Sequence, residues 1–190
     1  MPNRGCILAA IAAVAALTGS SALAAQGGRQ LARPAAQPTE PGAPAGEERL
    51  VAPARSVLRS LVGTWRFEIR FAGNFDGPPD VSGTRVMKAL FDSVKPEQLE
   101  WTEQLDDSTL QGRGLLGIDP TTGRFFATTV YNAGAAPEML SGTLDEAEPV
   151  VTFRPLAPGG TPFALSLVGA DHLLVTALDH TWRAVFTRRR

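Results

Sequence analysis

Residues 112–131, with the sequence GRGLLGIDPTTGRFFATTVY, decide the fold, because two short apolar segments flank one tight turn. In that turn the Asp119 side chain can accept hydrogen bonds from backbone N–H groups, Pro120 presets φ, and Gly123 can take a positive φ. A connection this short joins antiparallel neighbours, since a parallel pair needs a longer crossover. The stretch predicts a β-hairpin in which Asp119, Pro120 and Gly123 are structural residues.

Segments with alternating apolar and polar residues recur on both sides of this hairpin. The expected strands cover residues 64–71, 86–91, 99–105, 111–118, 124–131, 138–144, 150–154, 163–168, 173–178 and 181–187. Short strands at this spacing are typical of an all-β barrel or sandwich. We favour an up-and-down antiparallel barrel of about eight to ten strands, because closure leaves no open edge. A two-sheet sandwich is the alternative. A short helix over residues 56–62 is expected before the first strand.

The N-terminus predicts export. Arg4 is followed by an apolar run over residues 7–17 and by the small-x-small sequence Ala22-Leu23-Ala24, which is typical of a secretory signal peptide over residues 1–24. An uncleaved membrane anchor is the alternative. Cleavage after Ala24 would remove Cys6, the single cysteine, and with it any disulfide. We expect a periplasmic or secreted protein with no membrane span after cleavage.

Residues 25–53 are rich in Ala, Pro and Gly and predict an extended, mobile linker, because such a composition buries little apolar surface. The folded domain is then expected over residues 54–190. Its sequence carries no signal for an oligomeric state. A hydrophobic fraction of 44% and a formal net charge of −1 suit a globular domain and not a nucleic-acid-binding protein.

Two segments resemble known families. Residues 61–65, LVGTW, open the first strand and look like the Gly-x-Trp start of lipocalin-type (calycin) barrels, the group that includes fatty-acid-binding-protein-like folds. Residues 116–125, LGIDPTTGRF, are similar to the L-G-x-D-P-x-T-G-[RK]-[FY] block of a bacterial family, domain of unknown function 1579. The resemblance implies a lipocalin-like barrel, with Trp65 at its closed end and Arg183 or Arg188 stacked over the ring. It implies no catalytic residue.

A search for catalytic or metal-binding groups identifies none. His172 and His180 would lie at opposite ends of one expected strand, roughly 26 Å apart, so they cannot share a metal ion. Neither belongs to a Gly-x-Ser-x-Gly nucleophile motif. We therefore expect no metal and no cofactor; haem held by a single histidine is the alternative.

The expected interior face supplies a candidate pocket. Glu103 shares a face with Leu99, Trp101 and Leu105, so it is either a carboxylate inside the barrel or one that reaches solvent at the rim. The candidate lining consists of Phe67, Ile69, Phe71, Leu99, Trp101, Glu103 and Tyr131.

This lining favours non-catalytic binding of a small apolar or amphipathic molecule, with Glu103 or Tyr131 fixing its orientation. An enzyme that uses the same cavity, a hydrolase or isomerase with Glu103 or an Asp-His pair as base, is one alternative. An interaction module that reaches an envelope partner through its long linker is the other.

Overall fold

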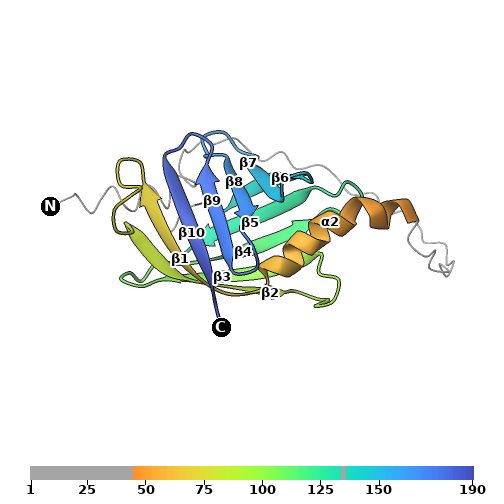
Figure 1. Ribbon diagram of the computed structural model, residues 1–190, viewed down its shortest axis with the longest axis horizontal. Coiled ribbons are helices and arrows are strands. Elements are labelled where there is room, and N and C mark those ends of the chain that lie inside the picture. The colour runs from red at the N-terminus through yellow and green to blue at the C-terminus, as the bar shows by residue number, and fades with distance from the viewer. Residues whose placement is uncertain (1–44, 134–135) are drawn as a thin grey trace, which may run out of the picture.

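The computed structural model describes residues 45–133 and 136–190 (Figure 1). In these residues, helix α2 (Ala45–Leu61) precedes ten strands. The strands are β1 (Gly63–Phe71), β2 (Val81–Ala89), β3 (Gln98–Leu105), β4 (Gln111–Ile118), β5 (Phe125–Tyr131), β6 (Glu138–Asp145), β7 (Val150–Pro155), β8 (Phe163–Leu167), β9 (His172–Ala177) and β10 (Trp182–Arg189). The expected signal peptide and residues 25–44 of the expected linker lie outside the described residues.

The strands form a closed barrel in which each strand pairs antiparallel with the next and β10 pairs with β1. The expected up-and-down antiparallel barrel is confirmed, and the sandwich alternative is wrong. The closing pair places Trp65 opposite Arg188 and Phe71 opposite Trp182. Because the sheet has no free edge, every strand has a hydrogen-bonding partner on both sides.

Alternation along each strand separates the core from the surface. In β3 the side chains of Leu99, Trp101, Glu103 and Leu105 are buried, and the residues between them are exposed. This is the period of two that a pleated strand imposes. Strand β2 differs from the expectation, since it begins at Val81 and not at residue 86. Its first half contains a glycine and several polar residues, so it lacks the apolar alternation that marked the other strands.

Glycines that face the interior make room for aromatic rings on neighbouring strands. A Cβ at Gly83 would lie 2.5 Å from Phe67 Cζ, and one at Gly112 would lie 2.5 Å from Tyr131 Cε1. The ladder places these glycines directly opposite aromatic residues: Gly83 opposite Phe67, Gly112 opposite Tyr131, Gly114 opposite Trp101, and Gly142 opposite Phe125 and Phe153. Each ring can therefore lie over the glycine next to it, along the barrel wall.

Helix α2 closes one end of the barrel. Its buried residues recur at helical spacing and belong to the same core as the strands: Val51, Ala54, Val57, Leu58 and Leu61. The helix begins at Ala45, so it includes residues 45–53, which the sequence analysis assigned to the linker. The buried positions continue the helical period across Pro53, and their packing offsets the hydrogen bond that a proline removes. Within residues 45–133 and 136–190, no helix has the length and apolarity needed to cross a membrane.

The junction between the helix and β1 is fixed by Trp65. This side chain is fully buried, and its Nε1 donates to the Leu61 carbonyl oxygen at 2.8 Å. The Arg188 guanidinium lies 4.2 Å from the Trp65 ring centroid and donates to the Val62 carbonyl oxygen at 2.6 Å. Gly63 has a φ of 141°, and a Cβ there would lie 2.5 Å from Arg188 Nη1. Only glycine suits this position, both for its backbone and for its contact with Arg188.

Of the two arginines expected over the Trp65 ring, Arg188 takes this position, and the Arg183 alternative is wrong. Arg183 stands opposite Arg70 in the ladder, at the other end of β10, and its guanidinium lies 5.0 Å from the Phe75 ring centroid. The two arginines lie on opposite faces of β10, because Arg188 shares the inward parity of Ala184 and Phe186, whereas Arg183 does not.

The turn between β4 and β5 has the geometry that its residues predict. The Asp119 carboxylate accepts hydrogen bonds from the Thr121 N–H at 2.9 Å and from the Thr122 hydroxyl at 2.7 Å. These bonds lower the pKa of the Asp119 carboxyl, with the Thr122 hydroxyl as the largest cause. Gly123 takes a φ of 67°, and its N–H donates to the Asp119 carbonyl oxygen at 2.8 Å.

Candidate functional site

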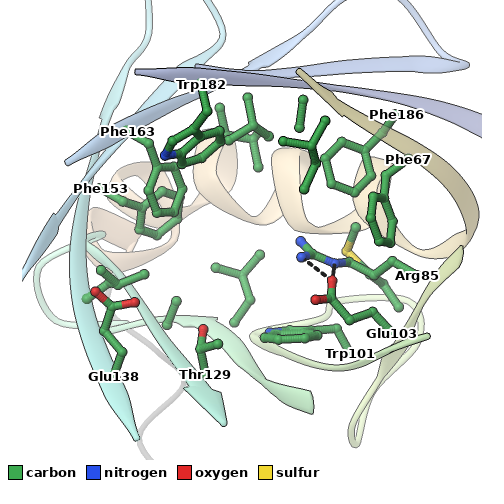
Figure 2. A pocket seen from close by; sticks show the side chains of 18 of the residues that line it. Phe67, Arg85, Trp101, Glu103, Thr129, Glu138, Phe153, Phe163, Trp182 and Phe186 are labelled. Atoms are coloured by element: carbon green, nitrogen blue, oxygen red, sulfur yellow. Dashed lines mark hydrogen bonds and ion pairs between the residues drawn. The ribbon is translucent and has the colours of Figure 1, made fainter. Parts of the chain in front are cut away.

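A cavity of about 170 Å³ lies inside the barrel (Figure 2). Helix α2 contributes Leu61 to its lining, and the strands contribute the rest. Aromatic side chains make up much of the wall: Phe67, Phe71, Trp101, Phe153, Phe163, Trp182 and Phe186. The charged residues of the lining are Arg85, Glu103 and Glu138. The cavity is thus mainly apolar, with a few ionisable groups, as in sites for small molecules.

The structure brings together most of the residues that the sequence predicted for the pocket. Those that line the cavity are Phe67, Ile69, Phe71, Trp101, Glu103 and Tyr131. Leu99 is the exception. It is fully buried, but it lies at the start of β3, opposite Ala89 and Leu116, where the wall approaches the helix-covered end. It therefore belongs to the packed core beyond the cavity lining.

Glu103 is buried and paired inside the barrel. Its side chain is 4% exposed, so it does not reach solvent at the rim. Arg85 stands directly opposite it in the ladder, and Arg85 Nε donates to Glu103 Oε2 at 2.9 Å. The same guanidinium lies 4.6 Å from the Trp101 ring centroid and 5.1 Å from that of Phe186. The pair is held by a charge-assisted bond and two cation–π contacts.

The electrostatics of this pair keep the Arg85 guanidinium charged. Desolvation disfavours the charged guanidinium, but the attraction of Glu103 outweighs it, so the pKa of Arg85 is raised above its usual value. Tyr131 lies next to the pair, over Gly112. Burial, with the negative charge of Glu103 as the second cause, raises the pKa of the Tyr131 phenol. The phenol therefore stays protonated near neutral pH and can donate a hydrogen bond.

Glu138 is a second buried carboxyl group in the barrel. It is the first residue of β6, stands opposite Thr129, and is 7% exposed. Among the residues that the structure describes, neither Oε1 nor Oε2 has a hydrogen-bond partner. Gly160 covers it closely, since a Cβ there would lie 2.7 Å from Glu138 Oε1. Burial raises the pKa of Glu138 to about 7. A buried carboxyl without a partner is uncommon in proteins and marks a candidate site.

An aromatic cluster lies on the same side of the cavity as Glu138. The Phe153 and Phe163 rings are stacked with centroids 5.2 Å apart, and the Trp182 ring follows at 6.0 Å from Phe163. Figure 2 shows Glu138 and this cluster along one wall, with Arg85, Glu103 and Trp101 across the cavity. The two ionisable sites are therefore separate.

Sequence reasoning missed Arg85 and Glu138. Arg85 was hidden because the expected second strand began one residue after it; the true start gives it the same inward parity as Met87. Glu138 had a usable signal, because it shares parity with Leu140 and Gly142, which are buried along β6. Because Glu138 is charged, it was not predicted to face the interior.

The histidines lie away from the cavity. His172 and His180 are both exposed, the first at the start of β9 and the second in the turn after it. His180 has a φ of 58°, a turn conformation. In the part of the chain that the structure describes, no group of three or more His, Cys, Asp or Glu side chains could hold a metal ion.

Comparison with known proteins identifies a family segment that includes part of the cavity lining. Residues 51–161 match the family model described as "Protein of unknown function (DUF1579)". This segment includes Arg85, Trp101, Glu103 and Glu138, whereas Trp182 lies beyond it. A search of curated proteins returned no match.

Proposed function

Because the chain belongs to the DUF1579 family, proteins of unknown function, we propose its function from the cavity: the barrel binds a small apolar or amphipathic molecule without transforming it. The observation that carries this proposal is an interior space lined by aromatic side chains and by few charged ones. Burying a ring or a short chain against such a wall is favourable by roughly 25 cal/mol per Å² of apolar surface.

The size of the cavity limits what it can enclose. Its volume of about 170 Å³ is close to that of an engineered apolar cavity of about 150 Å³ in another protein that admits benzene. We therefore expect the enclosed part of the ligand to be comparable to one aromatic ring. A larger ligand would extend toward the loops at the end opposite helix α2.

The aromatic side chains of the cavity wall are also held in place, which favours a cavity that stays open for a ligand. Trp101 lies against Gly114 and Tyr131 against Gly112, so these rings are fixed by the backbone opposite them. A preformed cavity does not have to order its side chains when a ligand enters, and this lowers the entropic cost of binding.

We also propose that the barrel is lipocalin-like. The Gly63-x-Trp65 sequence and the stacking of Arg188 over Trp65 support this relationship. Export, as a bacterial periplasmic or secreted protein, is a further part of the proposal and rests on the sequence of residues 1–24. The intact mass of the protein recovered outside the cytoplasm should then correspond to a chain that begins at Ala25. A full-length chain held in membranes would contradict export.

An enzyme is the second candidate, and Glu138 favours it. A carboxyl group with a pKa of about 7 in an apolar cavity is suited to accept or donate a proton near neutral pH. Incubation of the protein with a bound compound, followed by NMR of the released compound, separates the two candidates. Unchanged compound supports a binding protein, and a converted one supports an enzyme.

Native mass spectrometry of the protein purified from its own host tests the proposal directly. We expect the folded chain to carry a noncovalent adduct that is released on unfolding, and its mass gives the ligand class. The variant Trp101→Ala should lose the adduct, and Phe126→Ala, which removes a ring from the outer face of β5, should retain it. Equal adducts on both variants would contradict binding inside the barrel.

A further inference from the structure

The charges in the cavity are not balanced. Arg85 and Glu103 form an ion pair at 2.9 Å, so their formal charges cancel. Glu138 is the remaining charged residue of the lining, and neither of its carboxylate oxygens has a hydrogen-bond partner in the described part of the chain. With Glu138 ionised, the cavity has a formal charge of −1. A ligand with one positive charge would neutralise it.

The surroundings of Glu138 also suit a cation. The aromatic cluster of Phe153, Phe163 and Trp182 lies along the wall that holds Glu138 (Figure 2). Faces of aromatic rings attract ammonium groups, and the attraction is stronger where water is excluded. A carboxylate and a cluster of aromatic rings along one side of a cavity therefore suit an organic amine. An anionic ligand would meet the same carboxylate without a compensating charge.

We propose that the ligand is a small organic amine, protonated at neutral pH, whose ammonium group binds the Glu138 carboxylate and whose apolar body lies against Phe153, Phe163 and Trp182. This inference rests on the proposed binding function and specifies its ligand class. Thr129, directly opposite Glu138, lines the same part of the cavity and supplies a hydroxyl within the site.

The ionisation of Glu138 makes this binding depend on pH. Burial raises the pKa of Glu138 to about 7, so much of the empty protein carries a neutral carboxyl group at and below neutrality. The other ionisable groups of the lining are the Arg85–Glu103 pair across the cavity and Tyr131, which stays protonated. An ammonium group favours the ionised carboxylate. Amine affinity should therefore fall as the pH is lowered from 8 to 6, with release of a proton on binding below pH 7.

Calorimetric titration of the full chain at pH 8 with three matched probes tests the inference. The probes are 2-phenylethylammonium, 2-phenylethanol and 3-phenylpropionate, which share a phenyl ring and differ in charge. We expect the ammonium probe to bind at least about 10-fold more tightly than the alcohol, and the carboxylate probe to bind most weakly. The variant Glu138→Gln should reduce affinity for the ammonium probe by about 10-fold or more and change affinity for the alcohol by less than about 3-fold.

The matched control is Glu100→Gln, which removes an exposed carboxylate from the outer face of β3 and should leave all three affinities unchanged. Circular dichroism and thermal unfolding establish that each variant is folded. If the alcohol binds but the ammonium probe is not preferred, or if Glu138→Gln keeps that preference, the amine inference is wrong and cavity binding stands. If none of the probes binds the wild-type chain, the proposed function itself is wrong.

Discussion

Gly114 lies directly opposite Trp101 between β4 and β3, and a Cβ at Gly114 would stand 2.8 Å from Trp101 Cε2. The indole can therefore lie along the wall of the barrel, where it supports the Arg85 guanidinium at 4.6 Å. The same arrangement holds Tyr131 over Gly112. Glycine opposite an aromatic residue thus fixes the shape of the cavity as well as the packing of the sheet.

Substitution of Gly112 by alanine should distort this wall. The added Cβ would lie 2.5 Å from Tyr131 Cε1 and 3.0 Å from Glu103 Cγ, so both side chains must move. Because both are side chains and not backbone, we expect the variant to fold with a free energy of unfolding lower by about 1–3 kcal/mol. Urea unfolding measures the loss, with Thr143→Ala, on the outer face of β6, as the control. Stability equal to that of the wild type would show that Tyr131 is not held against Gly112.

Arg188 should contribute strongly to the stability of the barrel end that helix α2 closes. Its guanidinium stacks on Trp65 and donates to the carbonyl oxygens of Val62 and Ser60, each at 2.6 Å. Arg188→Ala removes the stacking and both of these hydrogen bonds, so we expect the free energy of unfolding to fall by about 2–4 kcal/mol in urea unfolding.

Two further variants, Arg188→Lys and Arg189→Ala, test which property of Arg188 stabilises the closed end. Lysine cannot present the planar fork that reaches both carbonyls while stacking, so it should recover only part of the loss. Arg189 is exposed and points to the outer face, so its removal should change little. Full recovery with lysine would mean that charge alone, and not guanidinium geometry, stabilises the junction.

Removal of one partner of the Arg85–Glu103 pair should lower the free energy of unfolding more than removal of both partners. Glu103→Leu leaves a guanidinium in the cavity without its counter-charge, and we expect a loss of about 3–5 kcal/mol. The double variant Arg85→Met/Glu103→Leu removes both charges and should recover much of that stability. A double-mutant cycle by urea unfolding measures the coupling. Additive single losses would contradict a direct interaction between the two side chains.

Glu138 should make the stability of the barrel depend on pH. Its pKa is raised to about 7 by burial, above the usual value near 4.5, so the folded state binds this proton more tightly than the unfolded state does. The resulting stabilisation is fully present below about pH 4.5 and is lost as the pH rises toward and through 7. Relative to Glu138→Gln, the wild type should lose up to about 3 kcal/mol of unfolding free energy between pH 4.5 and 8. A constant difference over this range would show that Glu138 titrates normally.

The fold could be predicted from the sequence because apolar and polar residues alternate along the strands with a clear period of two. Trp65, Phe67 and Ile69 alternate with arginine and glutamate, and the Asp119 turn sets the adjacent hairpin, so barrel class and strand order followed directly. The helix start could not be predicted, because the composition of residues 45–53 does not favour a helix and the burial of Val51 and Ala54 in the core depends on the folded structure.

Only the apolar part of the candidate site could be predicted from the sequence. Parity placed Trp101 and Glu103 in the interior, but it could not show that Arg85 is the partner of Glu103, since that depends on the register between β2 and β3. Nor could it show that Glu138 is buried, since Gly160, which covers it, comes from the distant β7–β8 loop. Pairing between strands, and not alternation within one, decides these features.

Fluorescence titration with an uncharged environment-sensitive dye, N-phenyl-1-naphthylamine, tests most directly whether the barrel interior binds small apolar molecules. We expect saturable binding to the full chain with quenching of tryptophan emission. Trp101→Ala should weaken the affinity by about 1–3 kcal/mol, the scale of a buried aromatic contact, and Phe126→Ala on the outer face should leave it unchanged. Binding of equal strength by the wild type and by folded Trp101→Ala and Phe71→Ala variants would contradict a ligand site inside the barrel.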